Sequence, residues 1–279
     1  MKAIFSAAAA MLLAGAAQAS MMGGLVIGGA DDVNDVLYLE PGQAPVPLFE
    51  NYSVWGVAAD NDNGLLYFVA GDQLSSWSIA EFGNLTPPTP LVSMTKQGGG
   101  QLTPAGLTWA NGKLYGSEVN SGVGNTGSIW EINTVTGVGT PIYTYDAKQF
   151  KLDALCFDDD SGLFYFLDSD LSGGRGLWSI DLIGGGDPVF ITDFAASQSA
   201  TLASGLAINK GRAYLVPGRS GPSNAPIAVF DLNTSMFVDE IENPLGGGLK
   251  QGGATWLVPT PGAMAIMMAG GIVAMRRRR

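Results

Sequence analysis

The chain has 279 residues, with 14 Lys and Arg against 25 Asp and Glu, and it contains no His. Five of the cations are Lys2 and Arg276–Arg279, so the rest of the chain carries nine cations against 25 acids, a net charge of −16. Such a body repels nucleic acid and anionic lipid. The lack of His removes the commonest general base and metal ligand, which disfavours hydrolytic triads and zinc sites. The one cysteine, Cys156, lies in an apolar run and is predicted to be a buried, inert thiol.

Residues 1–19 have the pattern of a secretory signal peptide. Lys2 precedes a short apolar run that includes Leu12 and Leu13, and Ala17-Gln18-Ala19 provides a small-residue cleavage site. The run is too short for a membrane span, which needs about 20 residues. We therefore predict cleavage between Ala19 and Ser20 and export through the Sec translocon.

From residue 20 to residue 258 a unit of about 50 residues recurs, as in kelch-type repeats. Each unit opens with a small residue, has a tyrosine on its second apolar run and has a large apolar residue on its third. The opening residues are Gly56, Gly106, Ala154, Gly205 and Gly253, the tyrosines are Tyr67, Tyr115, Tyr165 and Tyr214, and the third-run residues are Trp77, Trp130, Trp178 and Phe230. Short runs rich in β-branched and aromatic residues, repeated at this period, predict the four-stranded blades of an all-β propeller.

The order of strands within a blade follows from residue size. The small-residue run should be innermost, because blades crowd at the axis and leave no space for a side chain. Turns rich in Asn, Asp and Gly follow this run and have hairpin chemistry. The fourth run begins near a proline, at Pro90, Pro141 and Pro188, which places that strand at the outer edge.

The two ends of the repeated region are incomplete units that complement each other. Runs 24–28, 35–39 and 45–49 match strands two, three and four, while Gly253–Trp256 matches the first strand, Gly106–Trp109. We predict that the C-terminal run is the innermost strand of the first blade, so that Leu25 and Trp256 share a sheet. That arrangement closes a five-bladed ring and removes exposed sheet edges.

Candidate ligand-binding residues lie on the loops between second and third strands and on the connections between blades, because variable loops on a rigid scaffold commonly carry function. Asp153 stands out because it directly precedes a predicted innermost strand. The candidates are Glu118, Asn120, Asp153, Asp168, Asp170, Arg175 and Arg219. Ordinary solvated loop polarity is the alternative interpretation.

Two Asp-rich turns contain the hard oxygen ligands that Ca²⁺ prefers. They are represented by Asp60 with Asp62 and by Asp158 with Asp160. No Glu follows at the twelfth loop position of an EF-hand, and hairpin-turn chemistry explains these acids without metal. We therefore predict no cofactor and keep calcium as the alternative.

The C-terminal tail, residues 259–279, joins a proline-rich break to an apolar run, residues 263–275, and a basic end. The run falls short of the roughly 17 residues of a stable span, and its basic end would stay cytoplasmic. The residues that carry this pattern are Val258, Pro259, Thr260, Pro261, Arg276, Arg277, Arg278 and Arg279.

This tail resembles the PEP-CTERM sorting region of secreted bacterial proteins, with Thr260 in place of Glu as in the Pro-Thr-Pro variant. The resemblance implies a short hydrophobic helix, a transient inner-membrane anchor and processing by the transpeptidase exosortase. It also implies delivery to the cell surface or extracellular matrix of an exopolysaccharide-producing bacterium. A simple C-terminal membrane anchor is the alternative.

Three functions remain open from the sequence. One is a non-enzymatic binding module for a surface polysaccharide or another surface protein. Another is a purely structural scaffold. The last follows from a resemblance of the repeat to lactonase-like and NHL-type propellers, which implies a calcium-dependent enzyme with an axial metal held by Glu, Asn and Asp. Only Asp153, with Glu118, Asn120 and Asp168, could hold such a metal, because the other units have Trp55, Ala105, Ser204 and Gly252 where Asp153 stands.

Overall fold

The computed structural model describes residues 23–30, 35–50, 52–81, 85, 87–88, 90–118, 126–146, 151–168, 176–194, 203–218, 225–244 and 250–258. The predicted signal cleavage at Ala19 and Ser20, the tail from Pro259 onward, and the candidates Asn120, Asp170, Arg175 and Arg219 lie outside these residues. Within the described residues, no helix is long and apolar enough to cross a membrane.

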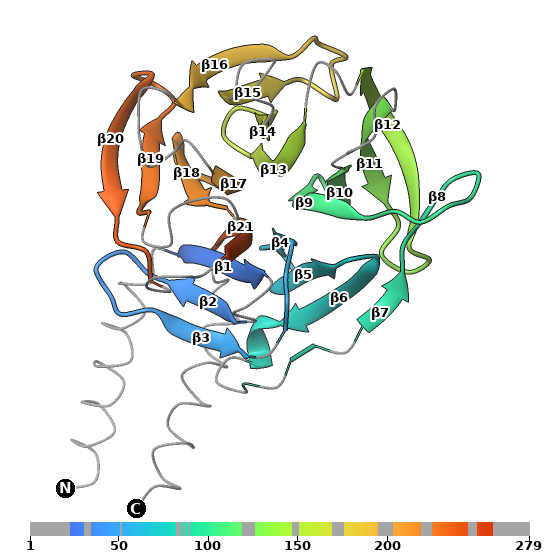
Figure 1. Ribbon diagram of the computed structural model, residues 1–279, viewed down its shortest axis with the longest axis horizontal. Coiled ribbons are helices and arrows are strands. Elements are labelled where there is room, and N and C mark those ends of the chain that lie inside the picture. Colours follow the sequence, from blue (N-terminus) through green and yellow to red (C-terminus); the bar gives the residue numbers. More distant parts are fainter. Residues whose placement is uncertain are drawn as a thin grey trace, which may run out of the picture.

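Five antiparallel blades surround a common axis, as the sequence predicts (Figure 1). The closing blade, named for its strands from both chain ends, contains β21 (Lys250–Leu257), β1 (Gly24–Ala30), β2 (Val36–Leu39) and β3 (Val46–Phe49). The second blade contains β4 (Gly56–Asp60), β5 (Leu65–Ala70), β6 (Gln73–Ser78) and β7 (Pro90–Ser93), with a 3-10 turn, η1 (Ile79–Glu81), after β6. The third contains β9 (Pro104–Ala110), β10 (Lys113–Glu118), β11 (Thr126–Ile132), β12 (Val138–Asp146) and the short β8 (Thr95–Lys96). The fourth contains β13 (Leu152–Asp158), β14 (Leu163–Asp168), β15 (Gly176–Ile180) and β16 (Val189–Asp193), and the last contains β17 (Ala203–Asn209), β18 (Arg212–Pro217), β19 (Ile227–Asp231) and β20 (Met236–Ile241).

The closing blade is assembled from both ends of the chain. Strand β21 pairs antiparallel with β1, and Leu25 is the register partner of Trp256, which confirms the predicted closure. The β4–β5 turn adds a second attachment, because the Asn61 amide donates to the Trp256 carbonyl at 3.4 Å and accepts from the Val258 N–H at 2.8 Å. The C-terminal strand is therefore held by its own blade and by the next one.

Small residues open the innermost strands because neighbouring blades leave no space there. A Cβ added to Gly253 would lie 2.7 Å from the Cα of Gly56, and one added to Gly106 would lie 2.7 Å from the Cα of Ala154. Hydrophobic clusters fill the spaces between adjacent blades. Two repeat tyrosines pack against a tryptophan of the next blade's inner strand, Tyr67 against Trp109 and Tyr214 against Trp256.

Two details differ from the prediction. Strand β12 begins at Val138 rather than at Pro141, which instead sits at a bulge opposite Trp130. A bulge tolerates proline because the ladder is already interrupted there. The connection from the second to the third blade also forms β8, which pairs in parallel with β12 and covers its edge. Nothing in the sequence pattern indicated this fifth strand.

Candidate functional site

The structure brings Glu118, Asp153 and Asp168 into one region around Tyr145, between the third and fourth blades. The Tyr145 hydroxyl donates to the Glu118 carbonyl at 3.0 Å. Burial raises the pKa of Tyr145, and the charges of Glu118, Asp168 and Asp153 raise it further. Three predicted candidates therefore share one electrostatic environment.

Two of these carboxylates already have protein partners. Glu118 forms an ion pair with Lys96 at 2.7 Å, and Lys96 also lies over the ring of Trp130, 5.6 Å from its centroid. The Asp168 carboxylate is fully buried and accepts from the Lys151 N–H at 2.9 Å. Asp153 lies inside β13, at the bulge between Leu152 and Ala154, and not before the strand as predicted. Because of this bulge, the strand begins at Leu152, two residues before Ala154, the small residue that opens the unit in the sequence.

Of the four residues that the lactonase-like resemblance implies as metal ligands, the structure describes Glu118, Asp153 and Asp168, while Asn120 lies outside the described residues. Glu118 is paired with Lys96, and one oxygen of Asp168 accepts from the Lys151 N–H, so two of these carboxylates already have contacts within the chain. Across the described part of the chain, no three His, Cys, Asp or Glu side chains are grouped closely enough to hold a metal ion. The predicted Asp-rich turns are included in that finding.

The Asp-rich turns are instead held by their own hydrogen bonds. Asp60 is buried and accepts from the Asn63 N–H at 3.2 Å and from the Asn63 amide at 2.8 Å. Asp158 is also buried and accepts from the Ser161 N–H at 3.2 Å. Asp62 and Asp160 are exposed. These contacts match the hairpin-turn interpretation, in which an Asp side chain caps the backbone two or three residues on.

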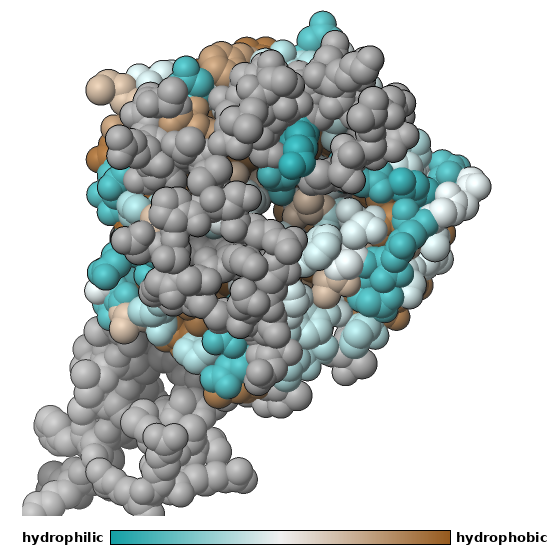
Figure 2. Space-filling view, in the orientation of Figure 1, coloured by the Kyte–Doolittle hydropathy of each residue, from teal (hydrophilic) through white to brown (hydrophobic). Residues whose placement is uncertain are grey.

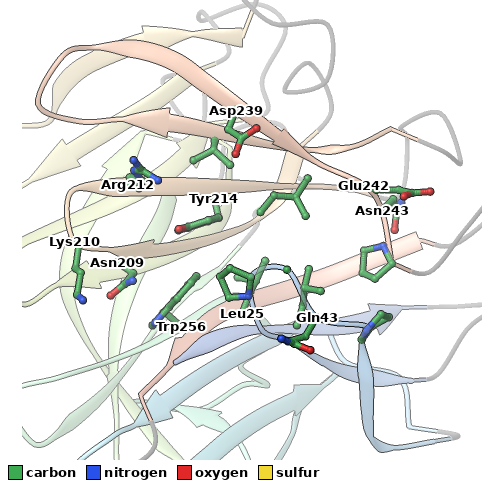
Figure 3. Close-up of a pocket in the computed structure, with 17 residues that line it drawn as sticks. Leu25, Gln43, Asn209, Lys210, Arg212, Tyr214, Asp239, Glu242, Asn243 and Trp256 are labelled. Carbon is green, nitrogen blue, oxygen red and sulfur yellow. The ribbon is translucent and has the colours of Figure 1, made fainter. Parts of the chain in front are cut away.

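A pocket of about 900 Å³ lies between the last blade and the closing blade (Figure 3). This volume is within the range of small-molecule binding sites. We call it the seam pocket, and it is lined by Leu25, Leu39, Pro41, Gly42, Gln43, Pro45, Asn209, Lys210, Arg212, Tyr214, Val229, Asp239, Ile241, Glu242, Asn243, Pro244 and Trp256. None of these residues is among the sequence-predicted candidates.

One wall of the seam pocket is the face of the last blade. Register partners share a face of a sheet, and the pairings place Tyr214, Val229 and Asp239 in one row across β18, β19 and β20. Arg212 and Asp231 form the adjacent row between β18 and β19. The wall therefore has apolar side chains in its middle and charged side chains beside them.

The other wall comes from the closing blade. Leu25 of β1, Leu39 of β2 and Trp256 of β21 are buried apolar residues, and the exposed β2–β3 turn adds Gln43. The rings of Trp256 and Tyr214 meet across the seam with centroids 4.9 Å apart, tilted by 31°. The floor of the pocket is therefore apolar, and it includes Leu25 from the first strand and Trp256 from the last.

The charges at the rim lie close to the floor. Burial raises the pKa of Tyr214, the charge of Arg212 lowers it and the charge of Asp239 raises it, so both charged groups act on one phenol. Neither Arg212 nor Lys210 has an ion pair within 4.0 Å among the described residues. The seam pocket thus presents cationic donors and carboxylate acceptors on either side of an aromatic floor.

The repeat itself contained a signal for this pocket. Two residues before the repeat tyrosine stand Leu65 in the second blade and Leu163 in the fourth, and both pack against hydrophobic clusters. The same position in the last blade is Arg212, which is exposed and lines the pocket. Two of the four units have leucine at this position and two have a cation, and both cations line hollows in the surface. The third blade has Lys113 there, beside a smaller hollow of about 330 Å³ in which Lys113 already pairs with Glu131 at 2.9 Å.

Elsewhere on the described surface, the outer strands expose apolar side chains. Val189 and Phe190 on β16, Met236 and Val238 on β20, and Leu91 on β7 are each more than a third exposed. In Figure 2 brown residues lie toward the outer edge of the ring, among hydrophilic ones. Single exposed apolar residues of this kind are common on protein surfaces and do not by themselves define a site.

Comparison with known proteins supports the fold and assigns no family. No family model matches the chain, and no curated protein does. Among solved structures, the chain is similar to one in the crystal structure of the Nidogen/Laminin complex, with 14% identity over 84% of this chain and 86% of that one and a TM-score of 0.54. It is also similar to a structural genomics protein of unknown function from Bacteroides thetaiotaomicron, with 14% identity over 84% of this chain and 62% of that one and a TM-score of 0.52. A gluconolactonase from Xanthomonas campestris matches with a TM-score of only 0.44. At these identities the similarity concerns the propeller fold alone.

Proposed function

We propose that this protein is an exported, non-enzymatic binding module that holds its ligand in the seam pocket. The observation that carries the proposal is the composition of that pocket, an apolar floor of Leu25, Tyr214 and Trp256 surrounded by polar rim side chains. A concave apolar surface with a few convergent polar groups is the usual form of a ligand site. A fold of this kind hosts many unrelated functions, so the argument rests on the pocket and not on the blades.

We propose the cellular location of the module from the sequence patterns at the two ends of the chain. The signal-peptide pattern of residues 1–19 and the sorting pattern of residues 258–279 support export, transient anchoring in the inner membrane and processing by exosortase. The acidic body supports a surface location without contact to nucleic acid or anionic lipid. We test the address by fractionating cells that express the full chain or a chain ending at Pro259. The shorter chain should appear in the medium, and identical partitioning of both chains would contradict the role given to the tail.

Binding can be followed through Trp256, because an indole that lines the site responds to a ligand there. Tryptophan fluorescence of the purified chain should change on titration with oligosaccharides or with peptides, and should not change with duplex DNA. Trp256→Phe should lose most of the optical signal while calorimetry still detects the ligand. If substitutions in the seam pocket do not change the affinity of any ligand that calorimetry detects, the proposed site is wrong.

The same titration separates binding from catalysis. The ligand should be recovered chemically unchanged after prolonged incubation, with or without added Ca²⁺. Calcium-dependent turnover of a lactone or another ester would support the enzyme alternative instead.

A further inference from the structure

We infer that the seam pocket binds a short stretch of an uncharged saccharide chain, an assignment that rests on the proposed function and names its ligand class. Three features of the pocket point to this ligand: the charge balance of the rim, the pairing of the wall strands, and the polar rim above an apolar floor.

The rim is electrically balanced although the body is strongly acidic. Lys210 and Arg212 contribute two positive charges, and Asp239 and Glu242 contribute two negative ones. The chain as a whole has a formal net charge of −11. A polyanion would meet the repulsive field of the body without a compensating basic patch at the site, and a polycation would meet Lys210 and Arg212 directly. The charge pattern therefore favours an uncharged ligand.

The rim also demands a ligand that both donates and accepts hydrogen bonds. Lys210 and Arg212 are donors only, the carboxylates of Asp239 and Glu242 are acceptors, and Gln43 carries one group of each kind. Sugar hydroxyl groups act as donor and acceptor at once. Arg212 lies two residues before Tyr214 on β18, and Asp239 lies in the same row of the sheet as Tyr214, so hydroxyls of one saccharide can accept from Arg212 and donate to Asp239.

The floor fits the less polar face of a sugar ring. Leu25 and Val229 are buried on opposite walls, and the rings of Tyr214 and Trp256 are each 7% exposed where they meet. The C–H groups of a pyranose form such an apolar face, while the hydroxyls project from the ring edge toward the rim. In Figure 3, Tyr214, Trp256 and Leu25 lie between the charged residues of the last blade and Gln43.

The central wall strands offer no edge for peptide pairing. Strand β18 is paired on both sides, by β17 and β19, and β1 is paired by β21 and β2. An extended peptide that binds by adding a strand needs unpaired backbone groups, which β18 and β1 lack. Only the outer strand of this wall, β20, which carries Asp239 and Ile241, lies at a sheet edge. Recognition through side chains above an apolar floor suits a saccharide better.

Calorimetric titration of the full chain tests the assignment with defined probes. We use neutral cello-, malto-, xylo- and chito-oligosaccharides, an acidic oligogalacturonate and a proline-rich peptide. At least one neutral oligosaccharide should bind. Arg212→Leu and Asp239→Asn should each weaken that binding about tenfold or more, since each removes a charge-assisted hydrogen bond.

The residues found at equivalent positions of the repeat guide the choice of Arg212→Leu and of its control, Lys113→Leu. Leucine occupies the position of Arg212 in two other blades, as Leu65 and Leu163, so Arg212→Leu suits the fold. Lys113→Leu makes the same change in the third blade, away from the seam, and should leave binding within twofold of the starting chain. Equal melting temperatures for the variants show that affinity changes do not come from unfolding.

Three results would contradict the inference. Two of them concern only the class of ligand, and the third also concerns the seam pocket as the binding site. Binding of oligogalacturonate or of the peptide in preference to every neutral sugar, with loss in Arg212→Leu, contradicts the saccharide class but leaves the seam pocket as the site. Absence of binding by every neutral oligosaccharide also contradicts the saccharide class. Binding of any probe that no seam-pocket variant weakens contradicts the proposed function as well.

Discussion

At the residue scale, Trp256 takes part both in closing the ring and in lining the seam pocket. It is 7% exposed, pairs in register with Leu25 and packs against Tyr214 of the preceding blade. Its sequence position, matching Trp109 in the repeat, was sufficient to predict burial and sheet membership. Its place on a pocket was not predictable, because that depends on how far the neighbouring blade covers it.

Replacing Trp256 by alanine should destabilise the domain. The change removes a large buried side chain and leaves a cavity in the seam, so we expect a loss of about 3 kcal/mol in the free energy of unfolding. Urea denaturation measures it. Trp55→Ala is the matched control, since Trp55 is 39% exposed, and it should cost clearly less than Trp256→Ala because less apolar surface is lost. Equal costs for both variants would contradict the buried role of Trp256.

Asn61 supplies a smaller, independent test of how the last strand is held. Asn61→Ala removes the hydrogen bonds to the Trp256 carbonyl and from the Val258 N–H. We expect a loss of about 1 kcal/mol in the free energy of unfolding. The neighbouring change Asp62→Ala, at an exposed residue, should stay within about 0.5 kcal/mol of the starting chain. A neutral Asn61→Ala would show that the attachment contributes nothing.

At the scale of the element, β21 should be the one strand whose loss opens the whole ring. Deleting residues 252–258 leaves β1 with an unpaired edge near the axis and removes the contact between Gly253 and Gly56. Thermal unfolding should shift to much lower temperature and lose cooperativity. A chain ending at Pro259 retains β21 and should melt like the full chain. Equal melting temperatures for the two shortened chains would contradict this role of β21.

The elements show which parts of the fold a sequence can specify. Strand order, closure and blade count follow from the repeat, because Gly106 and Gly253 are fixed by crowding at the axis, which is the same in every blade. Features outside the repeat were missed or misplaced. Asp153 and Pro141 lie at bulges, where local pairing shifts by a residue, and β8 belongs to a connection with no counterpart in other blades. The seam pocket was missed because it depends on how two blades from opposite ends of the repeat meet, and the cation at the position of Arg212 does not by itself show this, since the third blade has Lys113 there.

At the scale of the whole molecule, the buried tyrosines set the alkaline limit of stability. Burial, and to a smaller extent Glu40, raises the pKa of Tyr38 to about 12, and burial also raises the pKa of Tyr67, Tyr115 and Tyr214. A phenol whose pKa is higher in the folded chain stabilises the fold fully below its unfolded pKa of about 10 and loses that contribution as pH rises toward 12. The free energy of unfolding should therefore fall between pH 10 and pH 12. Tyr38→Phe should reduce the slope, and an unchanged slope would contradict the assignment to Tyr38.

The first and last strands, β1 and β21, are neighbours in one blade and so form the seam. Gly24 and Leu257 are register partners, which places the two ends of the folded body side by side. A circular permutant that joins Val258 to Gly23 and opens the chain at residue 51 makes the closing blade continuous. The measurement is the cooperative thermal unfolding of this permutant, compared between a two-residue Asn-Gly linker, which suits a hairpin, and a 20-residue Gly/Ser linker. We predict that the two-residue linker permits folding at least as well as the long one, whereas folding with only the long linker would show that the ends lie apart and that the ring is not closed in this way.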